Sequence, residues 1–273
     1  MESKPQFNKD QMTPEELSAW VEKKQDQRET VNALADRQLV DVFSDPQELN
    51  AHLKRQATFG KMGVTNVLLI GAQNVEATDV RTFEEWKERG RSIGKGEKAI
   101  AILSPKGEYT REDGTTRPNF EIKNVFDVSQ TRGKELRSRS YPPAKAVIKA
   151  MLTKAPIQIV WSDKVKDARY DRSTNQVEAN RELDADQLLY SVMREYAIAE
   201  GANEFTAQCV GAITCYRYSL MPEPVRYDPA SFRNMDSREL KNLLSDAREL
   251  ACGYCERIDQ NLQKMRERKQ EER

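Results

Sequence analysis

Histidine and long apolar stretches are the features that this sequence most clearly lacks. His52 is the only histidine in 273 residues, so a site built from two or three imidazoles is excluded. No apolar run approaches the roughly 20 residues that a membrane-spanning helix needs, and Met1–Pro5 lacks the apolar core of a signal peptide. We therefore expect a cytoplasmic protein with no membrane partner and with reduced cysteines, which are Cys209, Cys215, Cys252 and Cys255.

A net charge is also lacking. The sequence has 44 Lys and Arg residues and 44 Asp and Glu residues, so its overall charge does not indicate a nucleic-acid partner. The distribution is uneven, because residues 52–140 contain 17 basic and 12 acidic residues. Such a local excess suits phosphate binding, although a solvated surface of mixed charge gives a similar count. No P-loop, dinucleotide-binding fingerprint or Ser-His-Asp grouping is visible.

The stretch from residue 65 to residue 131 combines side-chain types that hold nucleic acid. An apolar segment, predicted to be helical, carries Asn66 and Gln73 seven residues apart and so on one helix face. An aromatic ring and a basic turn punctuated by glycines follow. Rings and amides hold unstacked bases, and cations contact phosphates. The residues predicted to bind DNA are Asn66, Gln73, Trp86, Arg89, Arg91, Lys95, Lys98 and Arg132.

Each of these residues also has a structural interpretation. Trp86 is somewhat more typical of a core residue than of a stacking platform, and Asn66 and Gln73 are equally suited to capping or cross-linking the backbone. Each cation taken singly is an ordinary surface charge. The clustering of the first four cations around glycines and an aromatic residue favours phosphate contact.

The order and spacing of this block resemble the N-terminal domain of the ArdC-like antirestriction proteins, a single-stranded-DNA-binding domain carried by plasmids, phages and conjugative elements. One departure is Met62–Gly63, where many relatives have a tyrosine-serine pair, so one possible stacking ring is missing. The resemblance implies binding of single-stranded DNA. The matching residues are Asn66, Leu68–Ile70, Gln73, Ala77–Thr78, Trp86, Gly90–Arg91, Lys95–Lys98, Ile100, Ile102, Pro105 and Val125–Thr131.

The element order expected for residues 156–220 resembles the metallopeptidase-like half that often follows this domain. In that half, a helix carries H-E-x-x-H, in which two histidines bind zinc and the glutamate activates water. The matching helix here has Arg194 and Ile198 at the histidine positions, and the acidic third ligand is missing near Gln208. A catalytic zinc needs three protein ligands. We therefore expect a pseudo-peptidase with no metal or other cofactor, in which Glu195 pairs with Arg194 or Arg217.

Two further motifs have structural interpretations. Cys252 and Cys255 have the spacing of a redox pair, but they fall inside an amphipathic helix predicted at 236–273, so we interpret them as small buried residues. A four-thiolate zinc site that adds Cys209 and Cys215 is a weaker alternative. The apolar spacing of that helix favours packing on its own domain over self-pairing. His52 is interpreted as a helix-surface residue.

Local signals predict the other elements. A hydroxyl cap before proline and acidic residues starts helices at Thr13 and Ser44, and Thr82 begins a capping box. These two N-terminal helices are expected to reach about residues 39 and 59. Strands are predicted at 99–103 and 120–128, with a hairpin tip at 107–119 and a domain linker at 131–143.

Together these patterns predict a two-domain α+β protein: a small antiparallel sheet with helices, then a zincin-like, mostly helical domain with a long final helix. The expected function is non-catalytic binding of single-stranded DNA in the protection of a mobile element. The alternative is an interaction module that binds a host defence protein through the second domain and final helix. The predicted divisions are a helical arm (1–40), the DNA-binding domain (41–135), the pseudo-metallopeptidase-like domain (142–230) and the C-terminal helix (231–273).

Overall fold

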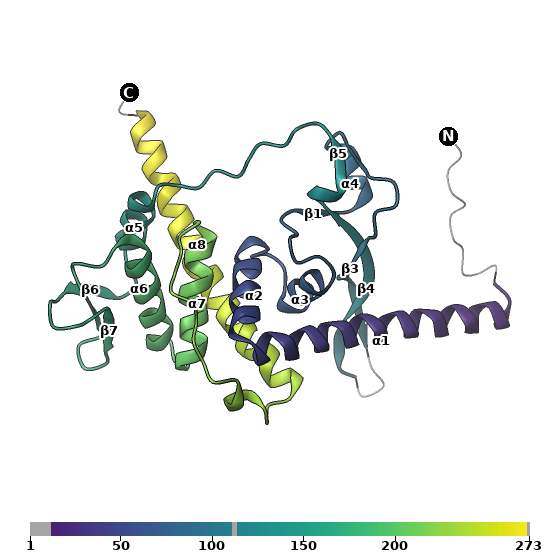
Figure 1. Cartoon of the computed structure of the whole chain (residues 1–273), viewed down its shortest axis with the longest axis horizontal. Coiled ribbons are helices and arrows are strands. Elements are labelled where there is room, and N and C mark those ends of the chain that lie inside the picture. Colours follow the sequence, from purple (N-terminus) through teal and green to yellow (C-terminus); the bar gives the residue numbers. More distant parts are fainter. Residues whose placement is uncertain (1–11, 111–113, 272–273) are drawn as a thin grey trace.

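The computed structural model describes residues 12–110 and 114–271 and has the expected α+β fold (Figure 1). The first half contains α1 (Pro14–Ser44), α2 (Pro46–Thr58), α3 (Val64–Gln73), β1 (Val80–Arg81), α4 (Phe83–Glu88), β2 (Arg91–Ile93), β3 (Ile100–Thr110), β4 (Thr116–Asp127), η2 (Val128–Gln130) and β5 (Thr131–Gly133). The second half contains α5 (Ala144–Leu152), β6 (Gln158–Trp161), β7 (Ala168–Asp171), β8 (Gln176–Ala179), α6 (Ala185–Ala199), α7 (Glu204–Arg217), η3 (Pro229–Phe232) and α8 (Ser237–Glu271). Within the described ranges, no helix is both long enough and apolar enough to cross a membrane.

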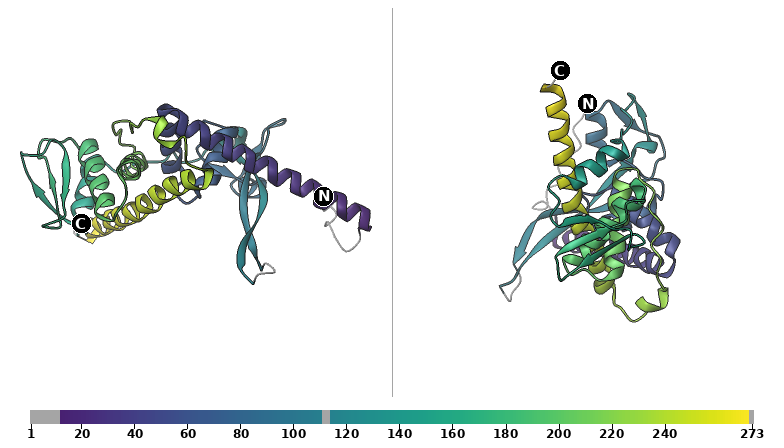
Figure 2. Two further views of the ribbon diagram at one scale, coloured as in Figure 1. Left: turned by 90° about the horizontal axis from the view of Figure 1, so that it is seen from below. Right: turned by 90° about the vertical axis from the view of Figure 1, so that its left-hand side faces the viewer.

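The sheet of the first half is a long hairpin with one short added strand. β3 and β4 pair in antiparallel fashion, with a register irregularity between Pro105 and Glu108. β1 pairs with the other side of β4, so the order is β1-β4-β3 and β3 lies at an edge. β2 and β5 form a separate two-stranded ribbon. The far end of the hairpin and the first turns of α1 project from the body of the protein (Figure 2).

The second half packs four helices beside a small mixed sheet. Its strand order is β6-β8-β7, with β6 parallel and β7 antiparallel to β8. The long helix α8 buries one face against this half, and its buried residues include Leu240, Ala247, Tyr254, Ile258 and Leu262. The prediction that this helix packs on its own chain is therefore confirmed.

The main hydrophobic core extends across both halves of the chain. α2 packs against α7, and the ends of α1 and α3 also contribute to this core. Its buried members include Leu39, Leu53, Leu68, Leu189, Val210 and Ile258. A smaller cluster, which includes Val67, Ile70, Ile100 and Val125, fills the space between α3 and the hairpin. The predicted domain limits stay predictions, and residues 1–11 of the predicted arm lie outside the described part.

Local signals located helix starts better than element ends. α1 and α4 begin directly after the capping boxes at Thr13 and Thr82, as predicted. α1 continues to Ser44, beyond the predicted end near residue 39, because its last turns are buried in the main core. β3 and β4 extend into the predicted hairpin tip, since the irregularity beside Gly107 allows pairing to resume. Residues 111–113 of that tip lie outside the described residues.

The prediction for His52 was wrong. Its side chain is 1% exposed, because α2 packs against α1, α3 and α7. Burial, and then the charge of Arg55, lowers the pKa of His52 to about 3. The imidazole is therefore neutral at physiological pH.

A buried carboxylate joins the start of β1 to the end of β4. The two carboxylate oxygens of Asp127 accept backbone hydrogen bonds from Thr78 (2.7 Å), Asp79 (3.0 Å) and Ser129 (2.8 Å), and one from the Ser129 hydroxyl (2.6 Å). Burial alone would raise the pKa of Asp127, but these hydrogen bonds outweigh it and lower the pKa below its ordinary value. The charged form is therefore the one that the fold stabilises.

We expect Asp127→Asn to destabilise the protein at neutral pH, because its amide NH2 would face donors in place of an acceptor. A lowered pKa gives stability that is present above the unfolded-state pKa, near 4, and is lost as pH falls through the folded-state pKa. The gap in unfolding free energy between wild type and variant should therefore shrink below about pH 4. Urea unfolding from pH 3 to pH 7 measures this gap, with the exposed Asp163→Asn as the control. A gap that stays constant with pH contradicts the assignment.

Candidate nucleic-acid interface

Asn66 and Gln73 bind the free edge of β3. The Asn66 amide donates to Leu103 O (2.8 Å) and accepts from Leu103 N (2.9 Å). The Gln73 amide does the same with Ala101, at 3.0 Å and 2.9 Å. A primary amide carries the same donor and acceptor as a peptide group, so the two side chains replace a neighbouring strand. Of the two structural roles considered for these amides, capping and cross-linking the backbone, the structure shows cross-linking.

Trp86 is part of the interior. Its side chain is fully buried, and its Nε1 donates to Phe126 O at 2.8 Å. The Arg81 guanidinium lies over the ring, 5.6 Å from the centroid. A ring without exposed surface offers no face to a base, so the stacking role predicted for Trp86 is corrected to that of a core residue.

Arg91 holds the β2–β5 ribbon together. Its Nε donates to Thr131 Oγ1 at 2.7 Å, its Nη2 donates to Thr131 O at 3.0 Å, and its Nη1 donates to Lys134 O. Gly133 approaches the opposite strand closely, since a Cβ there would lie 2.4 Å from Gly90 O. Its φ of 137° is also one that other residues rarely adopt. The ribbon is therefore a fixed platform.

The remaining predicted residues, Arg89, Lys95, Lys98 and Arg132, are exposed around this ribbon. Arg132 lies in β5 opposite Ser92, and the two lysines lie in the turn after β2. Gln130 fixes that turn, because its side chain donates to Lys98 O (2.8 Å) and its carbonyl accepts from Gly94 N (2.9 Å). In the described ranges, none of the ion pairs includes any of these four cations. We call these four residues the ribbon cations.

A cavity that the sequence did not indicate lies beside Asn66. It has a volume of about 660 Å³, and its wall includes Phe120, Lys61 and Lys123. The ring of Phe120 is 41% exposed, in a strand segment whose other residues are largely polar. In the sequence, the one signal for this cavity was an aromatic residue between the polar residues Asn119 and Glu121. The cavity therefore combines a ring with three lysines, the third being Lys241, and with the carboxylate of Glu85.

In the second half, the glutamate of the peptidase-like motif has a structural role. Glu195 is buried, and one carboxylate oxygen accepts from Arg194 Nη2 (2.7 Å) while the other accepts from Tyr170 N (2.7 Å). Burial alone would lower the pKa of Arg194, but the hydrogen bond and charge of Glu195 outweigh it, so the pKa is raised. Of the two partners predicted for Glu195, the structure shows Arg194, while Arg217 pairs with Asp259.

The side chains of this helix do not fit a metal ion. Arg194 and Ile198 offer no ligand atoms, and both oxygens of Glu195 are already engaged. Nor do three or more His, Cys, Asp or Glu side chains come together elsewhere in residues 12–110 and 114–271.

The cysteines are free thiols. Cys252 Sγ donates to Gly60 O at 3.3 Å, and burial raises the pKa of the Cys255 thiol to about 12. Burial also raises the pKa of Cys209 and Cys215. A protonated, buried thiol is a poor nucleophile and a poor metal ligand, which supports the structural interpretation for Cys255. Cys252 is half-buried, so the prediction that both residues of the pair are buried holds only for Cys255.

Residues 37–147 match the sequence family described as the N-terminal domain of anti-restriction factor ArdC. No curated protein sequence matches the chain.

Solved structures extend the likeness beyond this domain. The structure is similar to antirestriction protein ArdC from plasmid R388 in its Mn(II)-bound form, with 18% identity, a TM-score of 0.51, and coverage of 78% of this chain and 98% of that chain. The metal-free form of the same protein gives 18% identity and a TM-score of 0.48, with coverage of 74% and 84%. At this identity, the first of these likenesses shows that the two proteins share a fold.

We expect Asn66→Ala to destabilise the protein, because it leaves the N–H and C=O of Leu103 without their partner. An unsatisfied buried polar group costs about 1–3 kcal/mol, so thermal unfolding should begin several degrees lower. Thr65→Ala, on the neighbouring residue of the same helix, is the control. Unchanged stability of Asn66→Ala would show that the amide contributes nothing to the strand edge.

Proposed function

We propose that this protein binds single-stranded DNA without catalysing a reaction on it, and that this binding protects the DNA of an incoming mobile element from restriction. The observation that carries the proposal is the set of ribbon cations. They are exposed, outside the ion pairs of the described residues, and attached to a fixed platform. The match of the surrounding residues to an ArdC N-terminal domain supports the same function.

The proposed mechanism begins with the phosphates. Arg89, Lys95, Lys98 and Arg132 contact the backbone of the strand and release its condensed counterions, so affinity depends steeply on salt. Because the platform is held by Arg91 and Gln130, the cations are arranged before the strand arrives. This arrangement lowers the entropy lost on binding.

Bases need a surface as well as phosphates. Phe120 offers an exposed ring beside Lys61 and Lys123, and a ring of this kind stacks on any base. Asn66 and Gln73 support this surface from below by holding β3. Trp86 supports it by filling the core beneath β4.

The second half acts in this proposal as a scaffold. The Arg194–Glu195 pair occupies the position where the related peptidase-like motif would hold its metal and activate water. The proposed activity therefore needs no metal ion, and treatment with a chelator should leave DNA binding unchanged.

We expect Lys95→Glu/Lys98→Glu to weaken binding of fluorescently labelled oligothymidine at least about tenfold at low salt, because two phosphate contacts become repulsive. The slope of log affinity against log salt should fall by about 1.4, since each lost contact with a single strand removes about 0.7. Fluorescence anisotropy across a salt series measures both quantities. Lys164→Glu/Arg172→Glu makes the same change of charge on exposed residues of the second half.

The two outcomes that oppose this proposal are distinct. If wild type does not bind oligothymidine at low salt, the protein is not a single-stranded-DNA-binding protein, and the search moves to a host defence protein as its partner. If wild type binds but the ribbon and control variants lose the same affinity, the ribbon cations are not the site.

We expect Phe120→Ala to weaken oligothymidine binding roughly fivefold or more, because stacking contributes about 1–3 kcal/mol per base. The salt slope should stay at the wild-type value, since no charge is removed. Trp161→Ala, which removes a comparably exposed ring from β6, is the matched control. Equal affinity of Phe120→Ala and wild type would exclude this ring as a stacking surface.

A further inference from the structure

Two adjacent cavities form one cleft between the halves of the protein. Their volumes are about 390 Å³ and 710 Å³, and they share Arg139, Arg217 and Asp259. The linker between β5 and α5 crosses from one half to the other on this side of the molecule (Figure 1). Arg139 belongs to that linker, and its side chain lines both cavities.

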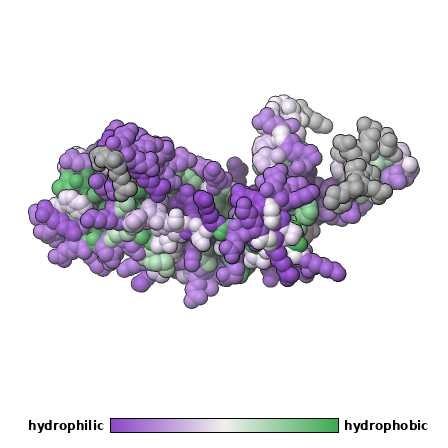
Figure 3. Space-filling view, turned by 90° about the horizontal axis from the view of Figure 1, so that it is seen from above, coloured by the Kyte–Doolittle hydropathy of each residue, from purple (hydrophilic) through white to green (hydrophobic). Residues whose placement is uncertain are grey.

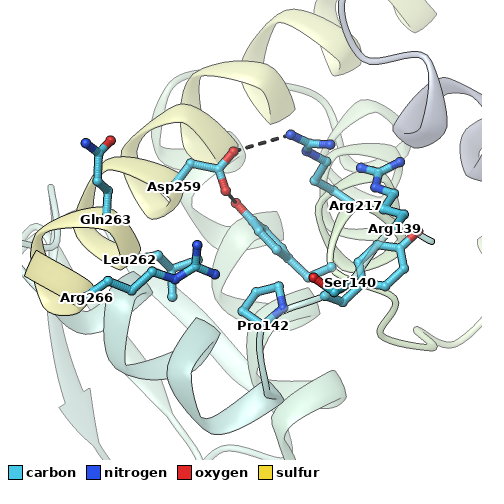
Figure 4. Close-up of a pocket in the computed structure, with 10 residues that line it drawn as sticks. Arg139, Ser140, Pro142, Arg217, Asp259, Leu262, Gln263 and Arg266 are labelled. Atoms are coloured by element: carbon cyan, nitrogen blue, oxygen red, sulfur yellow. Dashed lines mark hydrogen bonds and ion pairs between the residues drawn. The ribbon is translucent and has the colours of Figure 1, made fainter. Parts of the chain in front are cut away.

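Six cations are among the residues that line the cleft. Lys61 and Arg81 come from the first half, Arg139 from the linker, and Arg217, Arg248 and Arg266 from α7 and α8. In the smaller cavity, Arg139 and Arg217 lie on one side and Arg266 on the other (Figure 4). These six cations face three carboxylates, which are Asp79, Glu256 and Asp259.

Two of the carboxylates are already neutralised within the cleft. Asp79 pairs with Arg81 at 3.0 Å, and Asp259 pairs with Arg217 at 3.4 Å. The other four cations are in none of the ion pairs of the described ranges. An excess of positive charge therefore remains, on Lys61, Arg139, Arg248 and Arg266.

The cations are attached to a connected framework. Arg248 Nε donates to Met62 O at 2.8 Å, which joins α8 to the loop after α2. The Tyr218 hydroxyl donates to Asp259 at 3.0 Å, which orients the carboxylate that holds Arg217. The Arg139 guanidinium lies 5.1 Å from the ring centroid of Tyr141. Several guanidinium groups along one fixed cleft suit a ligand with regularly repeated phosphates.

The cleft also continues into the cavity that contains Phe120. Lys61, Met62 and Val80 line both, so the two cavities are adjacent. On the face seen in Figure 3 the surface is mostly hydrophilic, with hydrophobic residues in small patches. The cleft itself also has apolar walls, which include Phe59, Val80 and Ile213.

We propose that a DNA strand held at Phe120 continues through this cleft, where Arg139 and Arg266 hold the phosphates of nucleotides beyond the first domain. The inference rests on the proposed binding of single-stranded DNA and extends it to the second half. The second half then contributes directly to affinity for long strands.

Binding of labelled oligothymidines of 6 and 20 nucleotides tests this extension in the full-length protein. Wild type should bind the longer strand at least tenfold more tightly, since only that strand reaches the cleft. Arg139→Glu/Arg266→Glu should lose most of this gain while its affinity for the short strand changes less than twofold, because neither residue lines the cavity that contains Phe120. Arg266→Glu, at the far end of the cleft, should lose part of the gain.

Lys164→Glu/Arg172→Glu is the matched control and should keep the full dependence on length. Thermal unfolding checks that all variants fold, and the substituted residues Arg139 and Arg266 are exposed. If wild type binds both lengths equally, or if the cleft and control variants behave alike, the path through the cleft is wrong while DNA binding stands. If wild type binds neither length, the proposed function itself fails.

Discussion

The first half of this protein depends on two side-chain amides that pair with a strand edge. Asn66 and Gln73 each form two hydrogen bonds with the backbone of β3, so a helix supplies what a fourth strand would otherwise supply. The pairing fixes the distance of α3 from the hairpin, and the small core between them fills that space. It also closes an edge that could otherwise pair with another chain.

The residues that hold the β2–β5 ribbon and its neighbouring turn in place differ from the residues that face solvent. Trp86 and Arg91 are oriented inward or along the ribbon, where each binds backbone carbonyls. Lys95 and Lys98 are oriented outward from a turn that Gln130 holds. A fixed support beneath mobile, solvated side chains suits a ligand whose charges repeat and whose sequence does not matter.

Much of the fold follows from local chemistry in the sequence. Hydroxyl caps and their acidic partners gave the starts of α1 and α4, because capping is decided within four residues. The burial of His52 and the exposure of Phe120 were not predictable, since each depends on which elements pack above that residue. The amides were recognised as important, but their partners lie 28 and 37 residues away, in a strand whose edge the sequence does not identify. The cleft arises from segments that meet only in the folded chain.

The shared core has a consequence for how such proteins diversify. Leu53 on α2 and Val210 on α7 belong to the same core, and α2 packs against α7, so the first half presents an apolar face to this second half. A first half transferred by recombination to an unrelated partner would expose that face and aggregate. Exchange is therefore restricted to second halves that keep a helix equivalent to α7.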